Sequence, residues 1–134
     1  MITIEDKLKG RSILIVDDDD RNLYALSCYL EAMVPGMTVY RAPGGQEAIC
    51  ILEKHQDIAL VLMDIMMSRL DGYETIKRIR SCDKLKHLPV IAVTALVLDG
   101  DRDRCLLAGA SDYVSKPIDT EQLLKSIAGA LNLV

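Results

Sequence analysis

An unbroken apolar run that ends in four aspartates constrains this chain more than any other stretch. Residues 13–16 (ILIV) do not alternate with polar residues, which is typical of a strand buried on both faces of a parallel sheet. Aspartates at 17–20 follow directly. Carboxylates this close repel one another, so the arrangement is favourable only beside a metal ion, a lysine or the positive end of a helix. A solvated acidic loop with helix-capping residues is the simpler alternative.

The same pattern recurs at residues 58–63, an apolar stretch that ends on Asp64. Hydrophobic periodicity, turn residues and capping boxes divide the chain into five strands, each followed by a helix. The predicted strands are residues 12–17, 37–41, 58–63, 90–94 and 111–115. The predicted helices follow the acidic run, the Pro-Gly-Gly turn at 43–45, Asp71, Asp99 or Asp101, and Asp119. Residues 1–11 are predicted to be a polar lead-in that ends near Gly10.

Strict alternation of strands and helices predicts an α/β fold with a doubly wound parallel sheet and helices on both faces. Ligands of such folds bind beyond the carboxyl ends of the strands. The polar residues that end these strands are Asp17, Asp18, Asp64, Thr94, Ser115 and Lys116. We therefore expect them to meet at one edge of the sheet, which favours a functional site over a solvated acidic loop.

These residue types suit phosphoryl transfer. Asp17, Asp18 and Asp64 offer oxygen ligands to a hard cation, and so few protein ligands favour Mg²⁺ over Ca²⁺. The hydroxyl of Thr94 and the ammonium of Lys116 match phosphate oxygens. A metal, a lysine, a hydroxyl and a carboxylate nucleophile together predict chemistry through an aspartyl phosphate.

Composition narrows the class of protein further. The 134 residues are enough for one domain with a real core, and the net charge of −4 argues against binding nucleic acid through a basic surface. No signal-peptide pattern or membrane-spanning apolar run is present in the sequence, so we expect a cytoplasmic protein. The four cysteines are widely spaced and are expected to be reduced and mostly buried.

The chain resembles the receiver domains of response regulators (the CheY-like superfamily). Order and spacing match from about residue 12 to 131. The motifs are ILIVDD at 13–18, LMDIMM at 62–67 with DG at 71–72, VTA at 93–95 and YVSKP at 113–117. The resemblance implies a receiver domain at 12–134 with the flavodoxin-like (βα)5 fold and strand order 2-1-3-4-5. Residues 1–11 then remain the lead-in.

The resemblance also implies a two-component phosphorelay, in which Asp64 accepts a phosphoryl group from a phosphohistidine on a kinase or phosphotransfer protein. The chain would then be a phosphoacceptor that assists its own phosphorylation and dephosphorylation, and not an enzyme in the usual sense. By matched position, Mg²⁺ is bound by Asp17, Asp18, Asp64 and the backbone carbonyl of Met66. Thr94 and Lys116 contact the phosphoryl oxygens, Tyr113 is the aromatic switch, and the Lys116–Pro117 peptide bond is cis.

Four further expectations follow from matched positions. Ser68 stands where the family usually has proline, so the loop after the acceptor should be more mobile. Met66 and Leu96 cannot orient a hydrolytic water, which predicts a long-lived aspartyl phosphate. The family uses the fourth helix, fifth strand and fifth helix for output, and the apolar residues 96–98 belong either to this surface or to the packing beneath that helix. The first helix is where the family usually meets its phosphodonor.

Two other interpretations remain open. Asp17-x-Asp19 after an apolar strand also fits a haloacid-dehalogenase-type phosphatase, with Asp17 as nucleophile and Asp19 as acid/base, although the chain is short and has no cap insertion. A pseudo-receiver that binds partners without phosphorylation is the third, with Ser68 as its only support. We favour Asp19 and Asp20 as helix-starting residues over ligands. The chain is expected to be a stand-alone regulator or the receiver of a hybrid histidine kinase or larger regulator.

Overall fold

The computed structural model describes residues 2–67, 71–95 and 100–133. Its centre is a five-stranded sheet in which every neighbouring pair of strands is parallel. The strands are β1 (Ser12–Val16), β2 (Thr38–Ala42), β3 (Ile58–Asp64), β4 (Val90–Thr94) and β5 (Asp112–Ser115). Their order is β2-β1-β3-β4-β5, which confirms the predicted flavodoxin-like fold.

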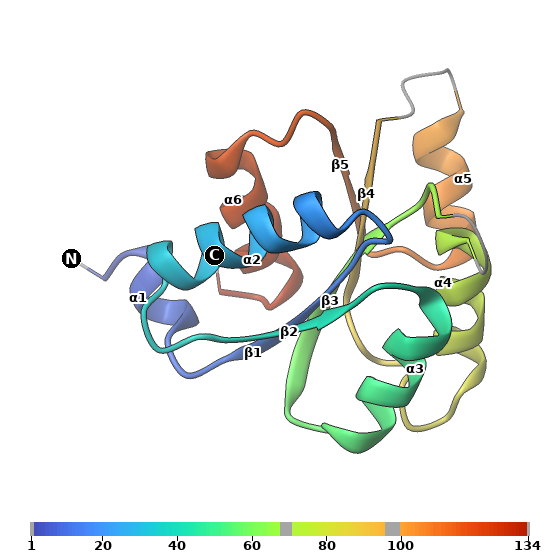
Figure 1. Ribbon diagram of the computed structural model, residues 1–134, viewed down its shortest axis with the longest axis horizontal. Coiled ribbons are helices and arrows are strands. Elements are labelled where there is room, and N and C mark those ends of the chain that lie inside the picture. Colours follow the sequence, from blue (N-terminus) through green and yellow to red (C-terminus); the bar gives the residue numbers. More distant parts are fainter. Residues whose placement is uncertain (1, 68–70, 96–99, 134) are drawn as a thin grey trace.

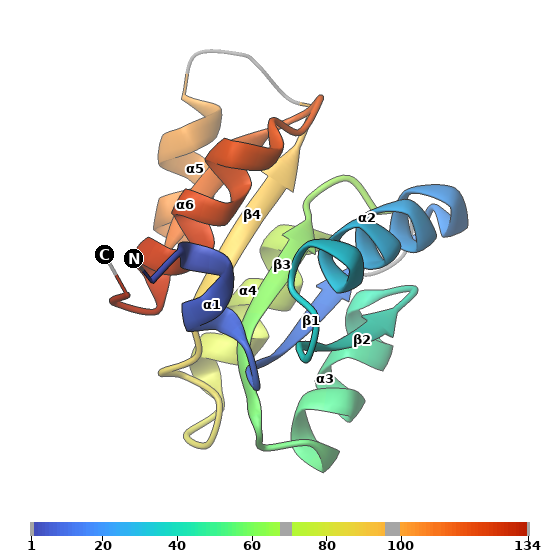
Figure 2. The same cartoon turned by 90° about the vertical axis from the view of Figure 1, so that its left-hand side faces the viewer.

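Helices cover both faces of this sheet. They are α1 (Ile4–Leu8), α2 (Asp20–Met33), α3 (Gly45–Lys54), α4 (Gly72–Ser81), α5 (Asp101–Ala108) and α6 (Thr120–Ala130). α1, α2 and α6 lie on one face, and α3, α4 and α5 lie on the other (Figures 1 and 2). This layering buries the sheet completely at its centre, where all five residues of β1 and of β4 are buried.

Two hydrophobic cores result from this arrangement, because successive side chains of a strand point to opposite faces. Leu14 and Val16 belong to the core beneath α3, α4 and α5, with Ile76 and Ile79 of α4. Ile13 and Ile15 face the other core, which contains Leu23 and Leu30 of α2 and Leu123 and Ile127 of α6. The continuous apolar character of residues 13–16 follows directly, since neither face of β1 meets water.

Aspartate side chains begin three of the helices, as the sequence predicts. Asp19, Asp71 and Asp119 stand just before α2, α4 and α6. Asp19 and Asp119 each accept two hydrogen bonds from backbone N–H groups of the first turn, and Asp71 accepts one. These bonds satisfy donors that a helix leaves unpaired at its start.

The prediction that Asp101 could cap α5 was wrong. Gly100 precedes this helix with φ +91° and makes no side-chain cap, while Asp101 is the first helical residue. Asp99, the other candidate, lies outside the described residues. Gly109 ends α5 with φ +114°, as expected for a glycine in the left-handed region.

The polar lead-in proved to contain a helix. α1 begins with a capping box in which Thr3 Oγ1 accepts from the N–H of Asp6 and the Asp6 carboxylate accepts from the N–H of Thr3. Leu8 is fully buried in the core that holds Leu123. Lys7 Nζ donates to the carbonyl of Leu133 at 2.9 Å, so α1 lies against the end of α6 (Figure 2).

The cysteines also depart from expectation. Cys105 is buried and Cys82 is partly buried, but Cys28 and Cys50 are exposed. All four are free thiols. No helix in the described part of the chain is long and apolar enough to cross a membrane. Ser68 and residues 96–98, for which a loop effect and an output role were predicted, lie outside the described residues.

Candidate functional site

Three carboxylates meet at the carboxyl edge of the sheet. Asp17 follows the last residue of β1, and Asp64 is the last residue of β3, the strand beside it. One carboxylate oxygen from each of Asp17, Asp18 and Asp64 lies within 4.8 Å of the other two. Asp17 and Asp64 are buried and Asp18 is exposed. The predicted convergence of these residues is therefore found.

The acidic run divides into two pairs with different environments. The N–H of Asp19 donates to Asp17 Oδ1 at 2.9 Å, which fixes the turn after β1. Asp19 Oδ1 accepts from the backbone N–H groups of Arg21 and Asn22. Asp20 is the first residue of α2. The prediction that Asp19 and Asp20 begin a helix is confirmed.

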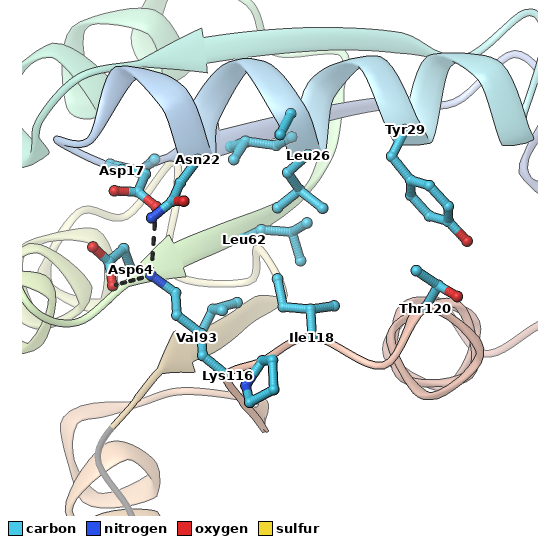
Figure 3. A pocket seen from close by; sticks show the side chains of 14 residues that line it. Asp17, Asn22, Leu26, Tyr29, Leu62, Asp64, Val93, Lys116, Ile118 and Thr120 are labelled. Carbon is cyan, nitrogen blue, oxygen red and sulfur yellow. Dashed lines mark hydrogen bonds and ion pairs between the residues drawn. The ribbon is translucent and has the colours of Figure 1, made fainter.

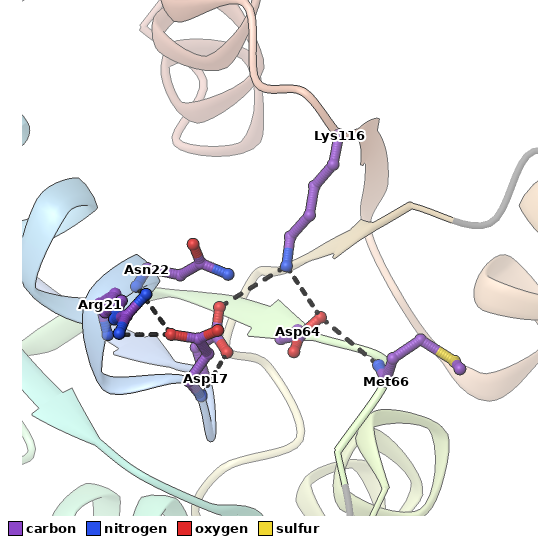
Figure 4. Close-up of polar contacts among 7 residues, drawn as sticks. Asp17, Arg21, Asn22, Asp64, Met66 and Lys116 are labelled. Carbon is purple, nitrogen blue, oxygen red and sulfur yellow. Dashed lines mark hydrogen bonds and ion pairs between the residues drawn. The ribbon is translucent and has the colours of Figure 1, made fainter.

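Lys116 supplies a positive charge beside Asp17 and Asp64. Its Nζ lies 3.4 Å from Asp64 Oδ1 and 3.6 Å from Asp17 Oδ2 (Figure 4). The backbone holds the residue in place, because the N–H of Lys116 donates to the carbonyl of Thr94 at 2.8 Å. The Lys116–Pro117 peptide bond is cis, as the resemblance implied.

Burial shapes the electrostatics of Asp64. Its side chain is almost completely buried, and desolvation, followed by the charge of Asp17, raises its pKa from 3.8 to about 6, against the opposing effect of Lys116. One ammonium therefore does not fully compensate the buried carboxylates. A group of hard oxygen ligands that still lacks positive charge is a chemical environment that suits a divalent cation such as Mg²⁺.

Thr94 and Tyr113 come from the neighbouring strands β4 and β5. Thr94 ends β4, is fully buried, and stands opposite Ser115 in the register of the two strands. Tyr113 is half-buried in β5. Burial, followed by the nearby charges of Asp101 and Cys105, raises the pKa of its phenol. Both neighbours belong to α5, so the ring of Tyr113 lies close to that helix. Thr94 lies at the same edge of the sheet as Asp64.

The segment after Asp64 contains a glycine whose importance was not recognised in the sequence. A Cβ on Gly72 would lie 2.5 Å from the carbonyl oxygen of Asp64 and 2.6 Å from Cα of Ile65. The N–H of Gly72 donates to the carbonyl of Ile65 at 3.1 Å. Only a residue without a side chain lets α4 begin this close to the end of β3. The signal in the sequence was the Asp71-Gly72 pair, which on its own indicates only a helix start.

Met66 follows the end of β3 by two residues. Its N–H donates to Asp64 Oδ1 at 3.4 Å, and its side chain is 61% exposed. The next residue, Met67, is buried. Residues 68–70 are not described, so the prediction about Ser68 stays a prediction.

A cavity of about 310 Å³ opens next to the carboxylates. Figure 3 shows its apolar side chains, which include Leu26 and Tyr29 of α2, Leu62 of β3, Val93 of β4 and Ile118 after β5. Asp64 and Lys116 lie at one end of it. The cavity thus joins an apolar surface to the charged site, an arrangement that suits a partner whose apolar side chains bind beside a reactive group.

Comparison with known proteins agrees with this geometry. The family model described as "response regulator receiver domain" matches residues 13–128 of this chain. The chain is 35% identical over 121 residues to the polar-differentiation response regulator DivK of Brucella anthropi, which covers 90% of this chain and 96% of that protein.

Solved structures show the same likeness. The chemotaxis protein CheY4 of Vibrio cholerae has a TM-score of 0.82 at 26% identity, over 90% of this chain and 98% of that one. A two-component response regulator from Clostridium difficile has a TM-score of 0.81 at 28% identity, over 91% and 96%. The chain therefore belongs to the family of response regulator receiver domains, the phosphoaccepting proteins of two-component signalling that interact with histidine kinases or phosphotransfer proteins.

Proposed function

We propose that this receiver domain accepts a phosphoryl group on Asp64 from a phosphohistidine of a histidine kinase or phosphotransfer protein, in a reaction that depends on Mg²⁺. The observation that carries the proposal is the position of Lys116 Nζ between Asp64 Oδ1 and Asp17 Oδ2, at 3.4 and 3.6 Å. A phosphoryl group needs this cation close to the attacking oxygen, because its own oxygens carry negative charge.

In the transfer, an oxygen of the Asp64 carboxylate attacks phosphorus and forms an acyl phosphate. The bond between phosphorus and the imidazole nitrogen breaks, its electron pair stays on that nitrogen, and the nitrogen takes up a proton from water as the histidine leaves. Thr94 and Lys116 contact the phosphoryl oxygens in this proposal, the hydroxyl as a hydrogen-bond donor and the ammonium as a charge. No further general acid or base is needed, since the carboxylate is the nucleophile in its ionised form.

Asp17, Asp18, Asp64 and the backbone carbonyl of Met66 are the proposed ligands of Mg²⁺. The three carboxylates supply closely spaced hard oxygens, and the ion supplies positive charge that lowers the repulsion between them and the incoming phosphoryl group. The raised pKa of Asp64 supports this assignment, because the site contains more negative charge than Lys116 offsets.

The apolar cavity beside α2 is the proposed docking surface for the phosphodonor. It carries apolar side chains from Leu26 of α2 and Ile118 after β5, and it reaches Asp64. A helix of the donor protein that presents apolar residues around its phosphohistidine fits such a surface.

The proposed output surface is formed by α5, β5 and α6. These are the fourth helix, fifth strand and fifth helix of the family pattern, because α1 precedes the first strand. Leu107 of α5 is 87% exposed and the neighbouring Leu106 is 39% exposed, which is typical of a helix that binds a partner. Tyr113 lies near α5 and is the proposed aromatic switch, moving inward with Thr94 on phosphorylation.

Two further properties remain predictions. Met66 and Leu96 lack a group that could orient a hydrolytic water, so we expect a long-lived aspartyl phosphate, with a half-life longer than seconds in Mg²⁺ buffer. The expected cytoplasmic location of the protein also stays a prediction, which cell fractionation with an antibody against the native protein would check.

The phosphatase alternative is not supported by Asp19. Its Oδ1 accepts two backbone hydrogen bonds at the start of α2, which leaves this carboxylate poorly suited to act as the acid/base of a hydrolase. The family match further favours a receiver.

Intact-mass measurement after incubation with acetyl phosphate and Mg²⁺ tests the proposal. We expect a gain of one phosphoryl group that is absent in Asp64→Asn and in the presence of EDTA. Hydrolysis of phosphate esters that requires Asp17 would instead indicate a phosphatase. A protein that shows no adduct, while circular dichroism shows it to be folded, would be a pseudo-receiver. A phosphorylated histidine phosphotransfer protein as donor then tests the natural direction of transfer.

A further inference from the structure

A second cavity, also of about 310 Å³, lies at the opposite edge of the sheet. It is lined where α3 ends, where β3 begins and where the chain returns from α4 to β4, in the lower part of Figure 1. Both histidines of the chain, His55 and His87, line it together with Lys84. These three residues have no part in the proposed phosphoryl transfer.

The floor and the rim of this cavity differ in character. Leu52, Ile58 and Leu85 form an apolar floor and are themselves buried. The ammonium of Lys84 and the hydrogen-bonding side chains of His55, Gln56 and His87 stand around it. Among the ion pairs of the described residues none involves Lys84, whereas its neighbour Asp83 pairs with Lys86 at 3.5 Å. The rim therefore presents a positive charge whose partner is not supplied by the described residues.

Arg80 fixes one wall of the cavity before any ligand arrives. Its Nη1 donates to the carbonyls of Leu88 and Lys86 at 2.6 and 3.1 Å, and its Nε donates to the carbonyl of Gly109 at 2.8 Å. These bonds hold the segment that carries Lys84 and His87 against α4. A partly buried guanidinium that donates to three carbonyls makes the segment between α4 and β4 rigid.

His55 belongs to the opposite wall. Its ring lies against that of Tyr40, with the ring centroids 4.5 Å apart. Its backbone N–H donates to the carbonyl of Ile51 at the end of α3. With both walls held in place, a ligand would bind without the cost of ordering loops.

We propose that this cavity binds a small organic phosphate, whose apolar or aromatic body lies on the floor while its phosphate group meets Lys84 and His87. An ammonium and an imidazole N–H are suitable donors to phosphate oxygens. The volume lies at the lower end of the range for small-molecule sites, about 300–1,000 Å³. This size and mixed lining favour a ligand about as large as a nucleoside monophosphate over inorganic phosphate alone.

Adenosine monophosphate is a suitable probe, with adenosine and inorganic phosphate as comparisons. The full chain is labelled with ¹⁵N and titrated with each compound in EDTA, so that no metal occupies the aspartate site. We expect saturable shifts of the amide signals of Ile58, Leu85 and His87 with the nucleotide. Adenosine and inorganic phosphate should each bind at least about tenfold more weakly, because each lacks one of the two complementary parts.

Lys84→Gln should weaken binding of the nucleotide by about tenfold, through loss of the charge-assisted contact. Lys77→Gln, which removes an exposed charge from α4 outside the cavity, should leave it unchanged. The spectrum of each free variant shows that it is folded. Equal binding by adenosine, equal binding by inorganic phosphate, or equal affinity in Lys84→Gln would overturn the proposal. It is likewise overturned if the shifts appear only around Lys116, or if none appear.

Discussion

Lys116 Nζ lies 3.4 Å from Asp64 Oδ1 although 52 positions separate the two residues. The same ammonium is 3.6 Å from Asp17, so one lysine partly neutralises two buried carboxylates. Lys116 and a divalent cation therefore act on the same negative charges. Each should affect the binding of the other.

Replacement of Lys116 by methionine should strengthen Mg²⁺ binding and slow phosphorylation by acetyl phosphate. The loss of a repulsive neighbour should make binding of the cation more favourable by about 1–2 kcal/mol, while the phosphoryl oxygens lose their ammonium contact. Isothermal titration calorimetry measures the affinity and intact mass measures phosphorylation. Lys77→Met is the matched control. A weaker affinity for Mg²⁺ in the Lys116 variant would contradict this account of the site.

Asp64→Asn should stabilise the metal-free protein at neutral pH. The folded-state pKa of about 6 is higher than the ordinary pKa of 3.8 for this side chain, so the folded protein binds this proton more tightly than the unfolded chain does. The stabilising contribution of the protonated group is complete below pH 3.8 and is lost as the pH rises through about 6. Asparagine does not titrate, so the variant should gain relative stability over this window, by up to about 3 kcal/mol.

Urea unfolding in EDTA at several pH values between 4 and 8 measures this gain. Asp103→Asn, on the exposed side of α5, controls for a general effect of removing negative charge. Addition of Mg²⁺ should then stabilise the native sequence more than the Asp64 variant. A gain that is the same at pH 4 and pH 8 would show that burial of the Asp64 charge is not its cause.

Gly72→Ala should destabilise the domain and impair phosphorylation together. Its Cβ would lie 2.5 Å from the carbonyl oxygen of Asp64. Because this atom belongs to the backbone, the end of β3 or the start of α4 must shift. A cost of about 1–3 kcal/mol is expected. Gly129→Ala in α6 is the control, since its Cβ meets no atom within 4 Å and should stabilise the helix by about 0.5–1 kcal/mol. Chemical denaturation and acetyl phosphate labelling measure the two effects.

Tyr73→Phe should leave the stability unchanged or raise it by up to about 1 kcal/mol. Tyr73 is buried at the start of α4, and within the described residues its hydroxyl makes no hydrogen bond. The aromatic ring itself contributes to stability, because it packs in the core and its centroid lies 4.3 Å from the guanidinium carbon of Arg104. Tyr73→Ala should therefore cost about 3–5 kcal/mol. A large loss in the phenylalanine variant would reveal a partner for the hydroxyl.

Leu8→Ala tests whether α1 is part of the folded domain. Leu8 is fully buried in the core shared with α6, so removal of its side chain should cost about 2–5 kcal/mol. The exposed residue Ile2 provides the comparison, since Ile2→Ala should change the free energy of unfolding very little. If both variants unfold at the same urea concentration as the native protein, α1 contributes little to stability in solution.

Local sequence patterns predicted the strands and helices well where one segment carried its own signal. The run at 13–16 has apolar residues on both faces of the strand, and Asp19, Asp71 and Asp119 precede helices whose N–H groups need an acceptor. Such signals are local, so they can be recognised without knowing the fold. The strand order and the assignment of Asp64 as acceptor required the family resemblance, because periodicity does not say which strand lies beside which.

Local patterns in the sequence were therefore enough to predict the five strand–helix units and the carboxylates that follow the first and third strands. Only the tertiary structure decided that Lys116 lies between Asp17 and Asp64, that Gly72 leaves no room for a side chain beside Asp64, and that Leu8 joins the core while Cys28 does not. These facts depend on contacts between segments far apart in the chain. The packing of the whole sheet and its helices creates them, and no short stretch of sequence contains them.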